Sequence, residues 1–542
     1  MRADWYEDAV VYSVDVETFY DADGDGVGDF RGLREKLPHI DRLGVDCIWL
    51  LPFYPTPNRD NGYDIEDYYG VDDRLGDLGD FTEFVDAAEE RGIRVIADLV
   101  VNHTSDQHPW FQRAREDPDS KYRDYYVWTD DPENAPERTL VFPGEEEDVW
   151  RYDEVADAHY YHRFYHFQPD LNIANPAVRE EIYKILRFWM SLGVSGFRVD
   201  AATLMIEPKG EGDLVIENPH QVFKRMKRTV RSARADGILL AEADDEPAKL
   251  GEYFGEGGDE MDLMLNFVLN AHVTHALATG SAEPIVEGLE RLPDPGDRGR
   301  FANFLRNFDE LNLGRLDEAD QEVTYEAFAP EEHMRIYDRG IRRRLGAMLE
   351  GDRDRIAMAH SLLFSLPGTP VVVAGDEIGM GDELSLPGRN PVRTPIHWGD
   401  APNAGFSTAD ADALVRPVID EGAFGYDRVN VDAQRVDPDS LLNRIARLSR
   451  ARDELPALKQ GVHEVLDVDA GAGADTDAEN VFAHRYDWED DGVVCLHNLG
   501  TEATTVDLPG AGGVRVAGRA SIKDGDVTLD RYEYCWVREG RP

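Results

Sequence analysis

The sequence predicts a closed parallel (β/α)8 barrel, with an inserted subdomain after the third strand and a C-terminal antiparallel β domain. Eight short apolar runs alternate with amphipathic stretches, which is the order expected of a barrel with its helices outside. The interval between the third and fourth runs is much longer than the others. Near residue 456 the pattern changes to an alternation of apolar and polar residues.

The eight apolar runs are the expected barrel strands. They occupy residues 11–16, 47–53, 94–101, 196–201, 238–243, 261–267, 301–308 and 370–378. Between them, FTEFVDAAEERG (81–92) and EEIYKILRFWMSLG (180–193) repeat apolar residues at steps of three and four and end at a glycine, which predicts helices. A doubly wound open sheet is the alternative, but no glycine-rich phosphate turn follows the first strand.

Two segments depart from the alternation of strands and helices expected of the barrel. Residues 103–175 are rich in Tyr, Trp, His and acids and are too long for a loop inside a compact domain, so we expect an inserted lid or substrate subdomain. Residues 456–542 are expected to form a C-terminal β-sandwich domain, with the polar stretch 470–479 as a turn or linker. The barrel would then comprise residues 1–102 and 176–455.

The charge balance is strongly acidic. The chain has 542 residues and a formal net charge of −52, with 109 acids against 57 basic residues, of which nine are lysines. Such a surface repels nucleic acid and anionic lipid, so neither is expected as a partner. The acids are spread along the chain, which argues against a disordered acidic tail. We interpret this composition as that of a protein from a halophile.

Other features of the composition indicate a cytoplasmic protein. Cys47, Cys495 and Cys535 are too few and too far apart for a disulfide framework or a structural zinc site. The N-terminus, MRADWYEDAV, lacks the basic start and apolar stretch of a signal peptide. No apolar run is long enough to span a membrane. An oligomer is compatible with the sequence.

Polar residues gather where the expected strands end, which is where barrel enzymes carry their chemistry. They are Tyr63 and Asp64 after the second strand, Asp98, Asn102 and His103 at the third, Arg198 and Asp200 at the fourth, Glu242 at the fifth, and Asn307 and Asp309 at the seventh. Acids from several strands are costly to hold together unless a positive group or a reaction uses them. The alternative is that these acids have only a structural role, capping helices or pairing with arginines.

Glycoside cleavage is the reaction that uses such acids most economically. One carboxylate attacks or stabilises the sugar carbon, and a second, protonated carboxyl assists the leaving oxygen. Asp200 suits the first role because Arg198, two residues earlier on the same strand, would keep it oriented and ionised. Glu242 suits the second because it follows the apolar run ILLA, and burial favours a protonated acid.

Four segments resemble the signature regions of the α-amylase superfamily of retaining glycoside hydrolases and transglycosylases. They are DLVVNH (98–103), GFRVDA (196–201), the segment around Glu242, and FLRNFDE (304–310). They occur in the order of that superfamily, and the resemblance extends over essentially the whole chain.

The resemblance implies a role for each matching residue. Asp200 would be the nucleophile, Glu242 the general acid/base and Asp309 the acid that grips the ring hydroxyls in the transition state. The pocket of the attacked ring would be lined by Tyr63, Asp64, His103, Arg198 and Arg393, the last in VRTPIHW.

Longer stretches, such as NHTSDQHPWFQ (102–112) and MRIYDRGIRRRL (334–345), resemble the branch of the superfamily that interconverts maltose and trehalose. Small α-glucosides would be the substrates: maltose, trehalose and short malto-oligosaccharides. That isomerisation must exclude water while the glucosyl-enzyme exists, and the aromatic-rich insert is the candidate lid. The alternatives are a hydrolytic α-glucosidase or small-substrate α-amylase, and a carbohydrate-binding protein without turnover.

Phe308 departs from the superfamily pattern, which has a histidine before the acid of the seventh strand. We expect Phe308 to bind the substrate, because its ring could stack against the sugar, although it cannot donate a hydrogen bond. Loss of one preorganised donor costs about 2.7–4 kcal/mol of transition-state stabilisation in analogous sites. Three explanations stay open for an active enzyme: slower chemistry, a compensating donor nearby, or a changed specificity.

Two structural metal sites are expected, and no organic cofactor. In DADGDGVGD (21–29), the side chains of Asp21, Asp23, Asp25 and Asp29 with the Val27 carbonyl could surround Ca²⁺ or Mg²⁺, although an Asp/Gly turn without metal is the alternative. The resemblance implies a metal at this loop. It also implies a second Ca²⁺ held by Asn102, Asp170 and Glu207 with carbonyl groups near Leu204.

Overall fold

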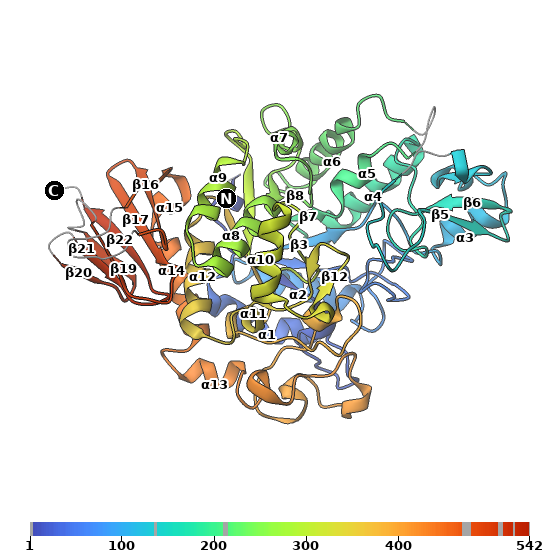
Figure 1. The fold of residues 1–542 in the computed structure, drawn as a ribbon. Helices are drawn as coiled ribbons and strands as arrows, with labels where there is room; N and C mark the ends of the chain where they lie inside the picture. The colour runs from blue at the N-terminus through green and yellow to red at the C-terminus, as the bar shows by residue number, and fades with distance from the viewer. Residues whose placement is uncertain are drawn as a thin grey trace.

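The computed structural model describes residues 4–134, 138–209, 215–468, 478–507, 513–523 and 526–540. Eight parallel strands close into a barrel in the order β1, β14, β10, β9, β8, β7, β3, β2, which confirms the predicted fold class (Figure 1). The strands are β1 Val11–Val14, β2 Cys47–Leu50, β3 Arg94–Leu99, β7 Gly196–Val199, β8 Ile238–Ala241, β9 Leu263–Leu265, β10 Arg300–Phe304 and β14 Thr369–Val373.

Each barrel strand overlaps one of the predicted runs, but most end earlier than predicted. The run 47–53 is paired only to Leu50, and the run 301–308 only to Phe304. Beyond these points the backbone leaves the ladder, so that polar side chains can turn toward the rim of the barrel. The sequence pattern marks apolar character and therefore overestimates how far hydrogen-bonded pairing extends.

Helices form the outer layer of the barrel domain. They are α1 Phe30–Leu43, α2 Leu78–Glu89, α4 Pro176–Ser191, α5 Ala202–Ile206, α6 His220–Ala233, α7 Pro247–Leu250, α8 Phe267–Thr279, α9 Glu283–Glu290, α10 Glu318–Phe328, α11 Leu345–Met348, α12 Arg353–Ser365, α13 Val431–Val436, α14 Leu441–Asp453 and α15 Pro456–Gln460. Helices α2 and α4 begin earlier than predicted because of their caps. Asp77 accepts hydrogen bonds from the first turn of α2, and Asn175 caps α4 ahead of Pro176.

The segment between β3 and β7 contains a small structure of its own, at the right of Figure 1. It consists of α3 Pro109–Glu116 and a three-stranded sheet ordered β4-β6-β5, with β4 Trp128–Thr129, β5 Trp150–Asp153 and β6 Ala158–Tyr161. His103 and Asp170, near the two ends of the segment, pair through an antiparallel bridge. The ends of the insert therefore meet where it leaves and rejoins the barrel.

The C-terminal region forms two antiparallel sheets, at the left of Figure 1. One is ordered β15-β16-β17-β22-β19 and the other β18-β21-β20. Their bounds are β15 Val462–Val465, β16 Val481–Trp488, β17 Asp491–Asn498, β18 Thr504–Asp507, β19 Val514–Gly518, β20 Ser521–Lys523, β21 Asp526–Leu529 and β22 Tyr534–Gly540. Trp536 donates a hydrogen bond to Ser361 of α12 at 3.0 Å, which joins this region to the barrel. Most of the expected linker 470–479 lies outside the described residues.

Another short sheet of the barrel domain lies between β10 and α12 in the sequence. It is ordered β11-β13-β12, with β11 Leu311–Asn312, β12 Arg335–Ile336 and β13 Gly340–Ile341. This sheet presents Tyr337 and Arg339, in the turn between β12 and β13, toward the insert.

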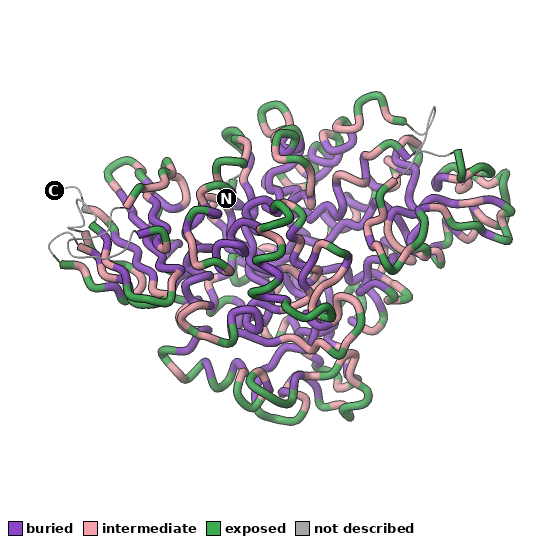
Figure 2. The backbone as a smooth tube through the Cα atoms, in the orientation of Figure 1, coloured by how far each residue is buried: buried purple, intermediate pink, exposed green. Residues whose placement is uncertain are grey.

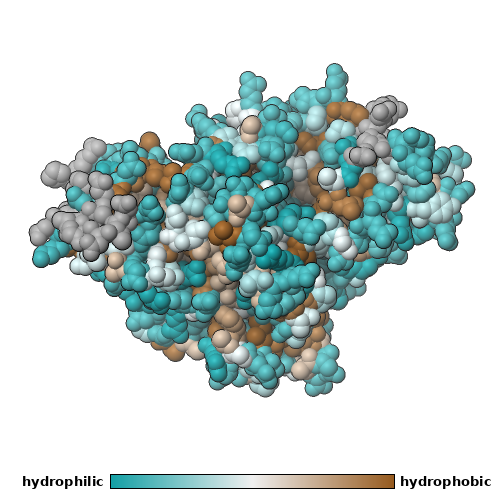
Figure 3. Space-filling model, in the orientation of Figure 1, coloured by the Kyte–Doolittle hydropathy of each residue, from teal (hydrophilic) through white to brown (hydrophobic). Residues whose placement is uncertain are grey.

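Burial is concentrated in the barrel. The strands at the centre of Figure 2 are purple, whereas loops at the periphery are green. The face shown in Figure 3 is predominantly hydrophilic, in keeping with the net charge of −52. Within the described part of the chain, none of the helices has the length and apolar character needed to cross a membrane.

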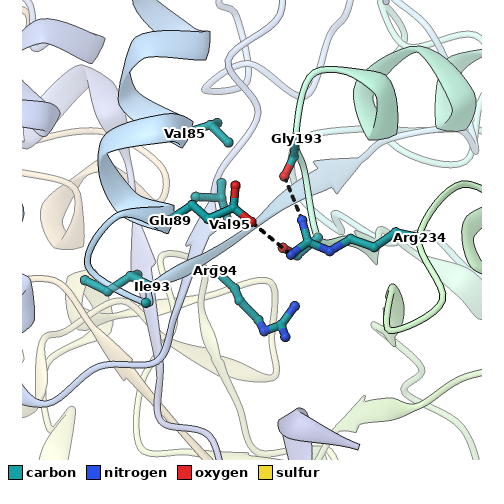
Figure 4. A pocket seen from close by; sticks show the side chains of 9 residues that line it. Val85, Glu89, Ile93, Arg94, Val95, Gly193 and Arg234 are labelled. Carbon is teal, nitrogen blue, oxygen red and sulfur yellow. Dashed lines mark hydrogen bonds and ion pairs between the residues drawn. The ribbon is translucent and has the colours of Figure 1, made fainter. Parts of the chain in front are cut away.

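A small cavity lies beside the start of β3, at the end of the barrel opposite the carboxyl ends of the strands (Figure 4). Its volume is about 100 Å³. Arg234 spans it, donating to the Gly193 carbonyl at 3.4 Å and pairing with Glu89 at 3.5 Å. Polar contacts at this end of a barrel usually serve stability.

Candidate active site

Carboxyl groups meet at the rim because adjacent strands end side by side. Val199 of β7 is in register with Ala241 of β8, so the next residues, Asp200 and Glu242, leave the sheet as neighbours. The Asp200 amide donates to Leu99 at 3.1 Å, and the Glu242 amide donates to Val199 at 2.9 Å. These backbone hydrogen bonds thus fix the positions from which the side chains of Asp200 and Glu242 project.

Arg198 is the centre of the carboxyl cluster. Its Nη1 donates to Asp200 Oδ1 at 2.6 Å and to both oxygens of Asp98 at 2.8 and 3.0 Å. Its Nη2 lies 2.8 Å from Glu242 Oε2. Burial lowers the pKa of Arg198, but the surrounding carboxylates, led by Asp98, raise it well above the ordinary value. One permanently charged guanidinium therefore orients three acids.

Three carboxyl groups share this single positive charge, so the cluster tends to retain a proton. Burial raises the pKa of Asp98 to about 6, against the opposing effect of Arg198. Burial also raises the pKa of Asp200 well above its ordinary value, and Arg198 opposes that shift too. Retaining glycoside transfer needs one carboxyl ionised and another protonated, and Arg198 is the group that opposes protonation of Asp200.

Glu242 is more accessible than the sequence predicts. Its side chain is 23% exposed and lines a cavity, whereas that of Asp200 is 8% exposed. An acid that protonates a leaving oxygen must reach the substrate, which accounts for the exposure. Glu242 Oε2 also accepts a hydrogen bond at 2.8 Å from the amide of Ala201, whose φ of 44° turns the chain directly after Asp200.

Asp309 is held by two arginines. Arg389 Nη1 and Arg393 Nη2 each lie 2.7 Å from its Oδ1. Burial would raise the pKa of Asp309, but these two guanidinium groups hold it below its ordinary value. Arg389 also donates to Asp60 Oδ1 at 2.7 Å. Asp309 is therefore ionised and fixed in position.

Asp60 and Arg389 are absent from the residues singled out in the sequence. Asp60, and not Asp64, contacts Arg389, the arginine that also holds Asp309. Asp64 is fully buried, and its carboxylate accepts hydrogen bonds from Thr56, Arg59 and Asp60, which close its own loop. A polar residue three positions before Tyr63 and an arginine one helical turn before Arg393 were the available signals.

Tyr63 joins the cluster, and His103 supports it. The Tyr63 hydroxyl donates to Asp98 Oδ2 at 3.2 Å. His103 is buried; its Nε2 donates to the Tyr63 carbonyl at 3.0 Å, and its Nδ1 lies 3.4 Å from the Asn102 amide. Both ring nitrogens face protein partners, so the predicted contact of His103 with a sugar stays a prediction.

Phe308 does not line the cavity. Its side chain is 4% exposed and packs in the main apolar core, while its carbonyl accepts a hydrogen bond from Arg393 Nε at 2.7 Å. The neighbouring Asn307 lines the cavity instead, and its Oδ1 has no hydrogen-bond partner among the described residues. Beside Asp309, this turn therefore presents the amide of Asn307 to the cavity and not the ring of Phe308.

The cavity above the carboxyls has a volume of about 420 Å³, within the range of small-ligand sites. Its wall combines carboxylates, arginines and apolar side chains. The lining residues include Leu140, Phe142 and Phe164 from the insert, Phe267 after β9, and Glu242, Asp244, Asn307, Asp309, Arg315 and Arg389 from the barrel. Alternating apolar and polar surface of this kind suits the faces and hydroxyl edges of sugars.

The insert is fastened across the cavity by contacts that we call the roof: Phe142, Tyr165, Tyr337 and Arg339. The hydroxyls of Tyr165 and Tyr337 lie 2.8 Å apart. The ring of Phe142 packs against both, with centroid distances of 4.4 and 4.6 Å. Arg339 donates to the Val141 carbonyl at 2.7 Å and to Glu310 at 3.1 Å. The roof therefore joins the insert to the barrel domain at the wall of the cavity.

The loop 21–29 brings together part of the predicted metal site. Carboxylate oxygens of Asp21, Asp23 and Asp29 all lie within 4.8 Å of one another. Asp23 is exposed; slight desolvation and then the neighbouring acids raise its pKa, and a cation would oppose that shift. Asp25 lies outside this group and accepts a hydrogen bond from the Val27 amide at 2.8 Å. The donor set fits a hard cation such as Ca²⁺ or Mg²⁺.

The predicted second Ca²⁺ site is wrong, because an ammonium group fills it. Lys209 Nζ lies 2.6 Å from Asp170 Oδ2 and 2.9 Å from Asn102 Oδ1. Glu207, the third expected ligand, turns instead toward Arg138 and Arg163, at 3.4 and 3.5 Å. Lys209, two residues after Glu207 in the sequence, was the signal that the prediction overlooked.

Known proteins resemble the chain in both sequence and structure. The sequence matches the alpha-amylase catalytic domain over residues 14–292 and 315–461. It is 41% identical to the trehalose synthase/amylase TreS of Mycobacterium tuberculosis (strain CDC 1551 / Oshkosh) over 93% of this chain and 83% of that protein. It is 39% identical to a trehalose synthase of Pimelobacter sp. (strain R48), over 93% and 89%.

Proteins of lower sequence identity also resemble the chain. An oligo-1,6-glucosidase of Parageobacillus thermoglucosidasius is 30% identical over 86% of each chain. Among solved structures, an alpha-amylase from H. orenii superimposes with a TM-score of 0.78 at 26% identity, over 98% of this chain and 99% of that chain. The trehalulose synthase MutB from Pseudomonas mesoacidophila MX-45 gives 0.78 at 25% identity, with the same coverage.

Proposed function

The chain belongs to the α-amylase family, and on that premise we propose that it interconverts maltose and trehalose by retaining glucosyl transfer. The observation that carries the proposal is that Arg198 holds Asp200 beside Glu242, and that Glu242 lines the cavity together with Asp309. The trehalose synthases that resemble the chain over most of its length support the choice of substrates.

The reaction proceeds in two displacements. In the first, an Asp200 oxygen forms a bond to C1 of the non-reducing glucose of maltose, while the C1–O4′ bond breaks and Glu242 protonates the departing oxygen. In the second, the retained glucose has turned, and its own anomeric hydroxyl attacks C1 while Glu242 takes up the proton. The Asp200 ester breaks and trehalose forms, with no net consumption of water.

Asp309 serves the step in which the sugar ring flattens. Its carboxylate, kept ionised by Arg389 and Arg393, accepts hydrogen bonds from ring hydroxyls that strengthen in the transition state. The two arginines fix Asp309 without any contribution from the side chain at position 308. The loss of the usual histidine therefore leaves the main electrostatic contact intact.

Hydrolysis is the second candidate, and it differs only in whether water reaches the glucosyl-enzyme. The oligo-1,6-glucosidase at 30% identity favours it. The roof favours transfer, because the insert is bonded across the cavity through Tyr165, Tyr337 and Arg339.

Substitution of the nucleophile tests the proposal. Asp200→Asn keeps the shape of the side chain but cannot form the ester, so kcat/KM for maltose should fall at least about a thousandfold. Asp73→Asn, an exposed acid elsewhere, is the control and should leave kcat/KM unchanged. A carbohydrate-binding protein without turnover would show no maltose conversion in any of the three proteins.

The loop 21–29 is proposed to hold one structural Ca²⁺ or Mg²⁺ through Asp21, Asp23 and Asp29. When bound, the cation neutralises these acids and takes no part in glucosyl transfer. Chelation with EDTA should lower the unfolding midpoint of the native protein in calorimetry but not that of Asp21→Asn. Equal responses of the two proteins would contradict a metal at this loop.

A further inference from the structure

Lys209 lies between β7 and α6, where four oxygen atoms enclose its ammonium group. Asp170 Oδ2 lies 2.6 Å from Nζ, and Asn102 Oδ1 lies at 2.9 Å. The carbonyl oxygens of Leu171 and Asn102 follow at 3.1 and 3.3 Å. The lysine is 5% exposed, and Asp170 is fully buried. A carboxylate, an amide oxygen and two carbonyls are the ligands of a hard cation.

The four oxygens come from two segments that must be joined. Asn102 follows β3, and Asp170 and Leu171 lie at the other end of the insert. The Leu171 amide donates to the Asn102 carbonyl at 2.8 Å, and Asn102 Nδ2 donates to Asp170 Oδ2 at 3.1 Å. Lys209 adds a third segment to this junction. Its ammonium group therefore ties together the base of the insert, the end of β3 and the connection to α6.

The junction leads directly to the carboxyl cluster. The Asn102 amide lies 3.4 Å from His103 Nδ1, and His103 Nε2 donates to the carbonyl of Tyr63 at 3.0 Å. The Tyr63 hydroxyl in turn donates to Asp98, which contacts Arg198. Each link is a hydrogen bond or a close polar contact between buried groups. A displacement of Asn102 would reach the residues that orient the nucleophile.

We propose that Lys209 is a positioning residue that acts as a covalently attached monovalent cation. It holds Asn102 against the insert and thereby fixes His103 and Tyr63 beneath the reacting sugar. The inference rests on the proposed glucosyl transfer for its kinetic consequences. Its structural consequence, a cage that accepts a small cation once the lysine is gone, does not depend on that function.

The charge balance argues against a divalent ion in the native cage. Asp170 is the acid that contacts Nζ, and Glu207 is engaged by Arg138 and Arg163. One ammonium group neutralises one carboxylate, and the side chain occupies the space between the oxygens. Removal of that side chain leaves a buried carboxylate without its counter-charge, together with an opening of the right chemistry for a cation.

Two substitutions separate the charge from the bulk of the side chain. Lys209→Ala opens the cage, whereas Lys209→Met fills it without charge. In choline chloride, both variants should lose at least about tenfold in kcat for maltose. Replacing choline by ammonium or potassium at constant ionic strength should restore most of the kcat of Lys209→Ala and none of that of Lys209→Met. Equal responses of the two variants, or a native kcat in Lys209→Ala, would overturn the proposal.

Lys227→Ala is the matched control. Lys227 is also buried and paired with an acid, Asp262, but that pair joins α6 to the segment before β9, away from the insert. This variant should lose stability without recovering kcat in any salt. Recovery by ammonium in Lys227→Ala as well would show a general salt effect and would overturn the proposal.

A calcium titration gives a readout that is independent of activity. Because the loop 21–29 is present in every variant, we compare proteins that also carry Asp21→Asn. The unfolding midpoint of Asp21→Asn alone should not respond to EDTA or CaCl2, since Lys209 fills the cage. Adding Lys209→Ala should create a response to CaCl2. A response of Asp21→Asn to EDTA would overturn the proposal even if Lys209→Ala fails to fold.

Absence of maltose conversion by the native protein would refute only the proposed function.

Discussion

Arg198 determines the geometry of the carboxyl cluster at the scale of single residues. Two adjacent nitrogens of its guanidinium contact Asp200 and Glu242, and one of them also contacts Asp98. A lysine has one nitrogen and could not orient three acids in this way. Removal of the guanidinium would leave buried carboxyls without compensating charge, which is strongly destabilising.

Phe308 gives the sharpest prediction at this scale. Its ring packs in the core, so Phe308→His would bury an imidazole among apolar side chains and not place a donor in the cavity. We expect no gain in kcat/KM for maltose and a loss of about 1–3 kcal/mol in the free energy of unfolding. Phe308→Leu, which keeps the site apolar, is the control. A tenfold rise in kcat/KM of Phe308→His would show that the native residue is a simple defect.

Individual residues mark the limit of what the sequence could predict. Asp200, Glu242 and Asp309 follow apolar strands, and the structure brings all three to one rim. Asp64 and Asp60 lie in the same loop with the same chemistry, and the turn of the backbone decides which of them meets Arg389. Such a choice depends on main-chain hydrogen bonds that sequence patterns do not encode.

At the scale of elements, the insert is a structural unit that contributes Leu140, Phe142 and Phe164 to the wall of the cavity. Its sequence predicts an inserted subdomain through length and aromatic content. The partner of that insert could not be predicted, because Tyr337 and Arg339 come from the short sheet between β10 and α12. Likewise, Lys209 reaches the base of the insert from the segment between β7 and α6, which turns an expected calcium site into an ion pair.

Loosening the roof should change how the glucosyl-enzyme is partitioned. Arg339→Met removes the bonds to Val141 and Glu310, and hydrogen bonds to a charged group contribute about 1.5–3 kcal/mol. We expect the ratio of free glucose to disaccharide product to rise about tenfold, as measured by NMR. Arg335→Met is the control, because Arg335 contacts Ala329 and the ring of Tyr325 outside the cavity. An unchanged ratio would refute the role of the roof.

At the scale of the whole molecule, the fold follows from the order of apolar runs. Eight runs with helices between them predict a barrel, and parallel strands with their carboxyl ends at one rim then predict where the acids meet. The net charge of −52 is a property of the whole surface. In dilute buffer the repulsion between these negative charges is unscreened, so activity is best measured in concentrated salt. The interpretation of the chain as a halophile's protein stays a prediction.

The most direct test of retaining transfer without water is to follow maltose by NMR in molar KCl prepared with ¹⁸O-labelled water. We predict trehalose as the main product, little free glucose, and no more label in trehalose than the anomeric oxygen of maltose acquires by exchange in a control without enzyme. Labelled glucose without trehalose would contradict the account, because it would mean that water, and not the retained sugar, resolves the glucosyl-enzyme. Unchanged maltose would refute these substrates altogether.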